Sequence, residues 1–337
     1  MVCDNIVAFG VSIMSLDWLI FLAFASGSLL FTAGTYLLLN HYSRRIASTL
    51  FAVGLAVTLM AGLAGAERLY RKFVSFTETE QTVASAVAEP LKQSLLSQPR
   101  YRDPKRLALY EAKAFSQNGE DGIIAEIFQR IGTTNRYFTE FGSADGRENN
   151  TVLLLRQGWH GLWMDVNPDL VRAAEGYFRR EVKSKQLQIV RAFITKENIQ
   201  DLFRKAGVPA EFDLLSIDID RNDYYVWEAI REFRPRAVVI EYNAIFPPTV
   251  DWVIEYDANA MWDVTSRYGA SLAALERLGR TKGYSLVGCN LTGVNAFFVR
   301  NDLVGDKFSA PYTAANHYEP ARDKIPVGVG GVSPRRP

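Results

Sequence analysis

The stretch YFTEFGSADG at Tyr137–Gly146 is the part of this 337-residue chain that decides its fold class. It reads as a strand that ends near Glu140, followed by a turn marked by Gly142 and Gly146. A helix is predicted to start near Asn150. In open α/β sheets such a turn lets a ligand lie against backbone at the carboxyl end of a strand. The stretch therefore predicts both a fold and a ligand site.

Strand-like and helix-like segments alternate from Phe115 onward. Apolar strands separated by helices predict an α/β fold with a mostly parallel sheet that helices cover on both faces. The last two strands are joined by a short turn containing Leu291-Thr292-Gly293, so they should form a hairpin with the final strand antiparallel. The predicted strands are Tyr137–Phe141, Gly161–Asp165, Leu187–Phe193, Phe212–Asp218, Ala237–Glu241, Ser285–Cys289 and Asn295–Arg300.

The charges at the first turn indicate which cofactor it suits. Its glycines are spaced Gly-x-x-x-Gly, unlike the Gly-x-Gly-x-x-Gly of dinucleotide sites. Glu140 and Asp145 would repel a pyrophosphate, whereas S-adenosylmethionine (SAM) has no phosphate and carries a cationic sulfonium and ammonium. Asp165 ends the next predicted strand, near the ~20-residue interval at which Rossmann-like folds place an acid on ribose hydroxyls. These residues favour SAM as the cofactor.

Acidic residues also end the next strands of the predicted sheet. Asp218, Asp220 and Asp223 follow the fourth strand, and Glu241 and Asn243 end the fifth. Clustered acids favour raised pKa values and proton transfer, or the binding of a hard cation. We therefore expect Asp218, Asp220 and Glu241 to be catalytic, with Asp218 and Glu241 as ligands if Mg²⁺ is used. One of the three aspartates is expected to cap the following helix.

Taken in order, these segments resemble the FkbM-like family of SAM-dependent methyltransferases over a little over half of the chain, from 115 to about 302. The resemblance implies a Rossmann-like fold, and the predicted five parallel strands followed by a hairpin are the strand plan of class I methyltransferases. It also implies transfer of a methyl group, usually to a hydroxyl oxygen of a sugar or another small molecule. The segments that carry it are Phe115–Asp121 (FSQNGED), Glu140–Gly146 with Glu148–Asn150, Trp159–Asp165, Ser216–Asp223 and Val239–Glu241.

Individual residues can be matched to the family motifs. The match implies that the turn after the first strand holds the methionine part of SAM and that Asp165 holds the ribose. Asp218 falls where the family has the acid after its fourth strand. The cofactor-binding residues expected on this basis are Glu140, Gly142, Ser143, Gly146 and Asp165.

Two uncharged apolar runs precede this domain, at about 18–39 and 46–66. Each is long enough to cross about 30 Å of hydrocarbon as a helix, and only six residues separate them. They predict a transmembrane helical hairpin with small residues that allow close packing. Basic residues are slightly more numerous after the second run than in the turn, and SAM is a cytosolic metabolite. We therefore expect a multi-pass protein of the cell membrane whose catalytic domain faces the cytoplasm.

The predicted organisation is an anchor at 1–66, a helical connector at 67–114, a methyltransferase-like domain at 115–305 and a C-terminal tail at 306–337. A net charge of +1 gives no field that would steer a polyanion, so nucleic acid is not an expected partner. The two cysteines form no disulfide framework, and no histidine pair has the spacing of metal ligands. The expected partners are the lipid bilayer and a small-molecule or glycan acceptor, while the acceptor's identity and the oligomeric state are not predicted.

Two other functions stay open at this point. Arg221 stands where the family usually has glycine, which supports a membrane-tethered, non-catalytic scaffold that kept the fold and lost the chemistry. The sequence Asp218-Ile219-Asp220 imitates the D-x-D of metal-dependent glycosyltransferases, although Glu140 and the glycine turn would then be unexplained. Methyl transfer from SAM, nucleotide-sugar binding, or neither would separate the three functions.

Overall fold

The computed structural model describes residues 90–262 and 265–322, which all lie within one compact unit, Ala84–Pro337. Within this described part, no helix is both long and apolar enough to cross a bilayer. The two predicted membrane helices, at about 18–39 and 46–66, lie outside the described residues, so the anchor stays a prediction.

Seven strands of the described chain form one mixed sheet in the order β3-β2-β1-β4-β5-β7-β6. Neighbouring strands are parallel except that β7 runs antiparallel to both β5 and β6. The predicted plan of five parallel strands and a hairpin is thereby confirmed. The strands are β1 (Tyr137–Phe141), β2 (His160–Asp165), β3 (Leu187–Arg191), β4 (Glu211–Ile217), β5 (Arg234–Glu241), β6 (Tyr284–Cys289) and β7 (Asn295–Arg300).

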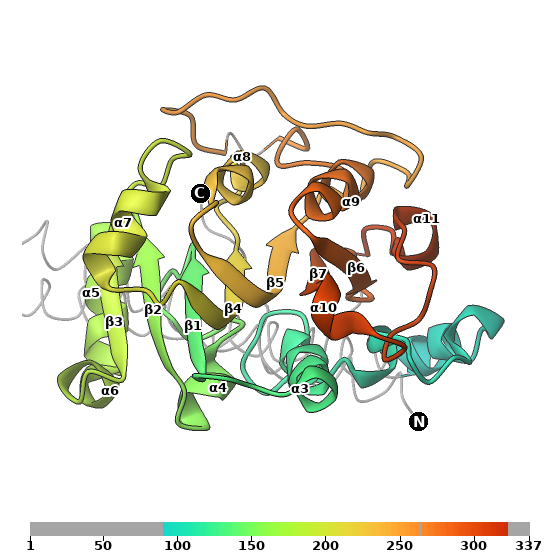
Figure 1. Ribbon diagram of the computed structural model, residues 1–337, viewed down its shortest axis with the longest axis horizontal. Coiled ribbons are helices and arrows are strands. Elements are labelled where there is room, and N and C mark those ends of the chain that lie inside the picture. Colours follow the sequence, from blue (N-terminus) through green and yellow to red (C-terminus); the bar gives the residue numbers. More distant parts are fainter. Residues whose placement is uncertain (1–89, 263–264, 323–337) are drawn as a thin grey trace, which may run out of the picture. The chain divides into compact units, whose positions relative to one another are not determined.

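Helices cover both faces of the sheet, with α3, α4 and α6 on one face and α7, α8 and α9 on the other (Figure 1). The alternation of side chains along each strand produces the two layers. In β1, for example, Phe138 packs on the α3 face and Phe141 packs on the α8 face. Both rings are fully buried, and the burial of each contributes about 1.5–3 kcal/mol to the free energy of folding. The helices are α3 (Glu120–Ile131), α4 (Val152–Arg156), α5 (Pro168–Tyr177), α6 (Arg179–Lys183), α7 (Ile199–Ala206), α8 (Asp223–Ala229), α9 (Leu272–Thr281), α10 (Asn301–Val304) and α11 (Ala314–His317).

Segments from the two ends of the described chain meet beside β5. The Tyr101 hydroxyl, in the short 3-10 helix η1 (Pro99–Tyr101), donates to the carboxylate of Glu319 at 2.7 Å. Arg100 and Arg322 form ion pairs with the same carboxylate at 3.0 and 2.8 Å. The Tyr242 hydroxyl donates to the Glu319 carbonyl at 2.6 Å, which ties this cluster to the end of β5. Parts of the predicted connector and of the predicted tail thus contribute buried side chains to this unit.

Candidate active site

Polar side chains form a row on the α3 face where the central strands end. The register pairs Glu140 of β1 with Ser216 of β4, and Glu241 of β5 with Asn295 of β7. The residues two positions before or after them along each strand are apolar and pack in the layer that contains α3. Because side chains alternate between faces, all four polar residues lie on this same face. The sheet therefore presents polar groups from four strands to one edge.

Gly142 lies directly against the turn that follows β4. Its φ is +66°, and a Cβ atom built on it would lie 1.7 Å from the carbonyl oxygen of Asp218. No side chain larger than hydrogen fits there unless the turn after β4 moves. The turns after β1 and β4, predicted to hold SAM and the acidic residues respectively, are therefore in backbone contact.

The other predicted residues of this turn are mostly buried. Gly146 has a φ of +82°, and a Cβ on it would lie 2.5 Å from the Trp163 ring, so packing explains this glycine. Ser143 is 1% exposed, and its hydroxyl has no hydrogen-bond partner among the described residues. A buried hydroxyl without a partner costs free energy, so Ser143 is the member of the turn that is best suited to meet a ligand.

Glu140 is buried and bonded within the protein. Its Oε1 accepts a hydrogen bond from the Asn150 backbone N–H at 2.9 Å, and its Oε2 accepts from the Thr151 N–H at 3.2 Å and from the Thr151 hydroxyl. Asn150 also donates its side-chain amide to Ser216 at 3.0 Å. Burial raises the pKa of Glu140 to about 7, while the bonds from Thr151 and Asn150 oppose that rise. In this structure the Glu140 carboxylate fixes the entry to α4, and its predicted contact with SAM stays a prediction.

Asp165 ends β2 as predicted and bridges two turns at the edge of the sheet. Its Oδ2 accepts from the Ala144 N–H at 2.8 Å, and its Oδ1 accepts from the Asn167 N–H at 2.7 Å. The side chain is only half-buried, and each oxygen can accept a further hydrogen bond. The two backbone N–H groups hold the carboxylate in place, and its remaining lone pairs can accept hydrogen bonds from ribose hydroxyls.

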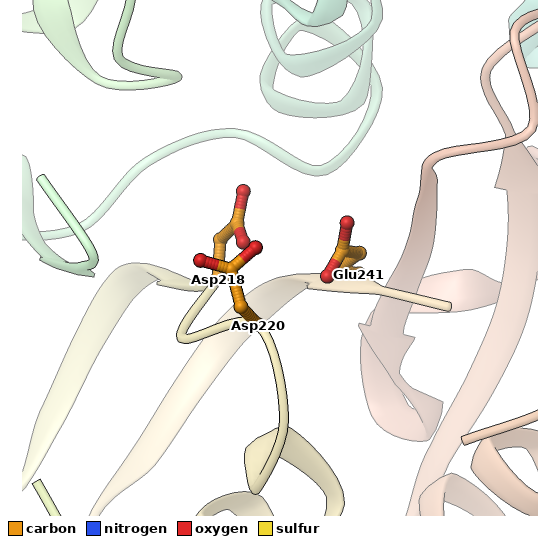
Figure 2. A group of neighbouring side chains, drawn as sticks. All are labelled: Asp218, Asp220 and Glu241. Atoms are coloured by element: carbon orange, nitrogen blue, oxygen red, sulfur yellow. The ribbon is translucent and has the colours of Figure 1, made fainter. Parts of the chain in front are cut away.

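The three residues predicted to be catalytic are brought together. One carboxylate oxygen from each of Asp218, Asp220 and Glu241 lies within 4.8 Å of the others. Figure 2 shows that Asp218 and Asp220 come from the turn after β4 and that Glu241 comes from the end of β5. Asp220 has a φ of +63°, a conformation that is uncommon outside glycine. The three neighbouring carboxylates could share a proton or hold a hard divalent cation.

Asp223 takes a different position from this trio. It is the first residue of α8, is 1% exposed, and its Oδ1 accepts from the Ile219 N–H at 2.8 Å. Burial, with a smaller contribution from the charge of Asp220, raises the pKa of Asp223 to about 6. Asp223 therefore stabilises the turn that carries Asp218 and Asp220. The N-cap of α8 is Asn222, whose side chain makes no capping bond.

The start of α3 supplies site residues to which the sequence had assigned no function. Glu120 is fully buried, and its Oε1 accepts from the side-chain amides of Asn290 and Asn295, each at 2.9 Å. Asp121 is also buried and adds to the negative charge around Glu140. The signal in the sequence was the FSQNGED motif, which carried the family resemblance without pointing to a contact.

Comparison with known proteins gives likenesses among solved structures. No protein-family model and no curated protein matches the sequence. The N-terminal domain of EvdMO1 with SAH bound is 14% identical, with 55% of this chain and 80% of that chain covered and a TM-score of 0.38. Magnesium protoporphyrin IX methyltransferase from Synechocystis with bound SAM is 10% identical, with 64% and 96% covered and a TM-score of 0.35. A putative O-methyltransferase from Klebsiella pneumoniae is 14% identical, with 66% and 99% covered and a TM-score of 0.36.

Proposed function

We propose that this protein is a SAM-dependent methyltransferase that methylates a hydroxyl oxygen. The observation that carries the proposal is the geometry of one sheet edge. Asp165 lies at the end of β2, the Gly142–Ser143 turn follows β1, and the trio of Asp218, Asp220 and Glu241 adjoins that turn through Asp218. Asp165 would accept hydrogen bonds from the ribose hydroxyls of SAM, and the turn would let SAM lie against the backbone. The trio, next along the edge, would accept the proton of the alcohol.

The charge at this edge fits SAM better than a phosphate-containing cofactor. Glu140, Asp165 and Glu241 lie at the ends of three strands at this edge, and Asp218 follows a fourth. The Arg147 side chain in the turn after β1 is paired with Asp145 at 2.6 Å. A carboxylate-rich edge attracts the sulfonium and ammonium of SAM and repels pyrophosphate. Bound SAM would supply a methyl group on a cationic sulfur, which is a good electrophile.

The chain's own carboxylates would manage the proton of the acceptor. As the hydroxyl oxygen forms its bond to the methyl carbon, its O–H bond breaks and the proton passes to Asp218. Bound SAM would give up its methyl group to that oxygen and would leave as S-adenosylhomocysteine, so that the acceptor becomes a methyl ether. Glu241 and Asp220 each place a carboxylate oxygen within 4.8 Å of one of Asp218, so three acidic side chains would face the acceptor hydroxyl together.

A metal-assisted version uses the same residues. Asp218 and Glu241, with Asp220 beside them, offer oxygen ligands of the kind that Mg²⁺ prefers. A bound cation there would lower the pKa of the acceptor hydroxyl and orient it. Removal of divalent cations with EDTA distinguishes this version from the general-base version.

The finer assignments are extensions of the same proposal. Membership of the FkbM-like family, suggested by the ordered motifs, would favour a sugar or glycan hydroxyl as acceptor. The two apolar runs at about 18–39 and 46–66 would hold the domain at the cytoplasmic face of the membrane, near lipid-linked acceptors.

The test is transfer of radiolabelled methyl from SAM. Purified full-length protein, incubated with membrane extract and labelled SAM, should produce a labelled acceptor, and the Asp218→Asn variant should not. Binding of a nucleotide sugar without methyl transfer would favour a glycosyltransferase instead, and binding of neither ligand would favour a non-catalytic scaffold.

A further inference from the structure

The beginning of α3 and the segment before it make polar contacts on two sides of the row formed by Glu140, Ser216, Glu241 and Asn295. On one side, Glu120 accepts hydrogen bonds from the amides of Asn290 and Asn295 at the ends of β6 and β7. On the other side, Lys113 pairs with Glu148 at 3.6 Å, close to the turn after β1. The segment that leads into α3 therefore lies over the same sheet edge as the proposed SAM site, on the face that carries Glu140 and Glu241.

Within that segment, the two oxygens of Asp121 have different environments. Its Oδ2 accepts from the backbone N–H groups of Ala114, Phe115 and Ser116 at 2.7–2.8 Å, and from the Ser116 hydroxyl at 2.9 Å. Its Oδ1 is buried and has no hydrogen-bond partner among the described residues, in a side chain that is 2% exposed. Four donors fix the carboxylate through one oxygen, and the other oxygen is left to accept from a ligand.

Several more buried polar atoms around this edge lack partners within the described chain, and three of them lie near the turn after β1 or the start of α3. These three are the Ser143 hydroxyl, the Asn149 side-chain N–H₂ and the Asn295 side-chain oxygen, in residues that are 1%, 7% and 4% exposed. Ser143 and Asn149 flank the turn after β1, and Asn295 lies beside Glu120 and opposite Glu241. Buried polar atoms are normally satisfied, so this concentration at one edge points to a bound polar group with both donors and acceptors.

We propose that these atoms bind the amino-acid end of SAM, with Asp121 as the main partner of its α-ammonium. The inference rests on the proposed function. Asp121 Oδ1 accepts a hydrogen bond from the ammonium, while Ser143 and Asn149 donate to the α-carboxylate. Glu140, which the sequence analysis assigned to the methionine part, already receives bonds from Asn150 and Thr151 on both oxygens. Asp121 of α3 therefore recognises the α-ammonium, and Glu140 positions the turn between β1 and α4.

Calorimetric binding to the full-length protein tests this assignment with three ligands. S-adenosylhomocysteine carries both the ammonium and the carboxylate, decarboxylated SAM keeps only the ammonium, and methylthioadenosine lacks both groups. Asp121→Asn keeps an oxygen for the donors at 114–116 and replaces Oδ1 with an N–H₂ group. It should weaken the first two ligands by roughly 10- to 100-fold and leave methylthioadenosine unchanged.

A second variant covers the carboxylate half of the site. Because the Ser143 hydroxyl has no internal partner, Ser143→Ala should fold normally. It should weaken S-adenosylhomocysteine but not decarboxylated SAM. Equal weakening of all three ligands by Asp121→Asn would mean that Asp121 is only structural and would overturn the inference, as would unchanged affinity for S-adenosylhomocysteine in both variants. If the wild-type protein bound none of the ligands, the proposed function itself would fail.

Discussion

Gly142 and Asp218 touch through their backbones: a Cβ at position 142 would lie 1.7 Å from the Asp218 carbonyl oxygen. The contact links the turn proposed to hold SAM to the turn that carries the proposed base. Movement in one turn must therefore be matched in the other, so the contact couples the proposed cofactor site to the proposed base. This contact matters because methyl transfer depends on the alignment of the attacking oxygen, the methyl carbon and the sulfur.

The first prediction follows from that contact. Gly142→Ala should displace the turn after β4 and lower both SAM affinity and stability, since its φ of +66° also disfavours alanine. Gly176→Ala is a matched control, because that glycine lies in α5 with nothing near its Cβ position. Thermal unfolding should show a loss for Gly142→Ala and little change or a gain for Gly176→Ala. Equal melting temperatures for the two variants would show that the contact is unimportant.

The second prediction concerns Glu140 and pH. Burial raises its pKa from 4.5 to about 7, so the folded state binds this proton more tightly than the unfolded state does. Its stabilising contribution is present below pH 4.5 and is lost as the pH rises through about 7, with an upper bound of about 3 kcal/mol. The difference in unfolding free energy between wild type and Glu140→Gln, measured with urea, should therefore shift against wild type between pH 5 and 8. A difference that stays constant over this range would contradict the assigned pKa.

The third prediction concerns the ribose contact. Asp165→Ala removes a carboxylate that also fixes the turn through the Ala144 N–H. Calorimetry should show S-adenosylhomocysteine binding weakened by about 1–3 kcal/mol. Asp169→Asn provides the control, since Asp169 is an exposed residue of α5 that pairs with Arg172. Wild-type affinity in Asp165→Ala would place the ribose elsewhere.

The sequence predicts features that depend on neighbouring residues, but not contacts between residues far apart in the chain. Strands and the acidic edge were predictable because they depend on local patterns, namely apolar runs and acids at strand ends. The hydrogen bonds that Glu140 accepts within the protein were not predictable. A carboxylate in a sequence motif looks the same whether it binds a ligand or the backbone of Thr151. The pairing of Glu120 with Asn295 joins residues 175 positions apart, and no spacing rule reports such a contact.

The fourth prediction tests the acidic trio. Asp218→Asn removes the proposed proton acceptor and should lower kcat by roughly 100- to 10,000-fold, with little effect on SAM binding. Asp306→Asn is a control, because the Asp306 side chain is 98% exposed and lies in another part of the unit. EDTA should abolish turnover only if the trio binds a metal, and Mg²⁺ should then restore it. Full activity of Asp218→Asn would exclude both versions and leave catalysis by positioning.

The fifth prediction concerns the membrane. Two uncharged runs of the sequence, at about 18–39 and 46–66, should keep the full-length protein in the membrane pellet after extraction with alkaline carbonate. Recovery of intact protein in the supernatant would exclude the anchor. A reporter fused to the C-terminus should report a cytoplasmic position, and a signal from the opposite side would reverse the predicted orientation.

Calorimetric titration of S-adenosylhomocysteine into the full-length protein in mild detergent tests most directly whether this sheet edge binds SAM. We expect saturable binding at one site per chain, strongly weakened by Asp165→Ala and unchanged by Asp169→Asn. The absence of binding to the wild-type protein, under conditions where its thermal unfolding shows a folded domain, would contradict the assignment of this sheet edge to SAM.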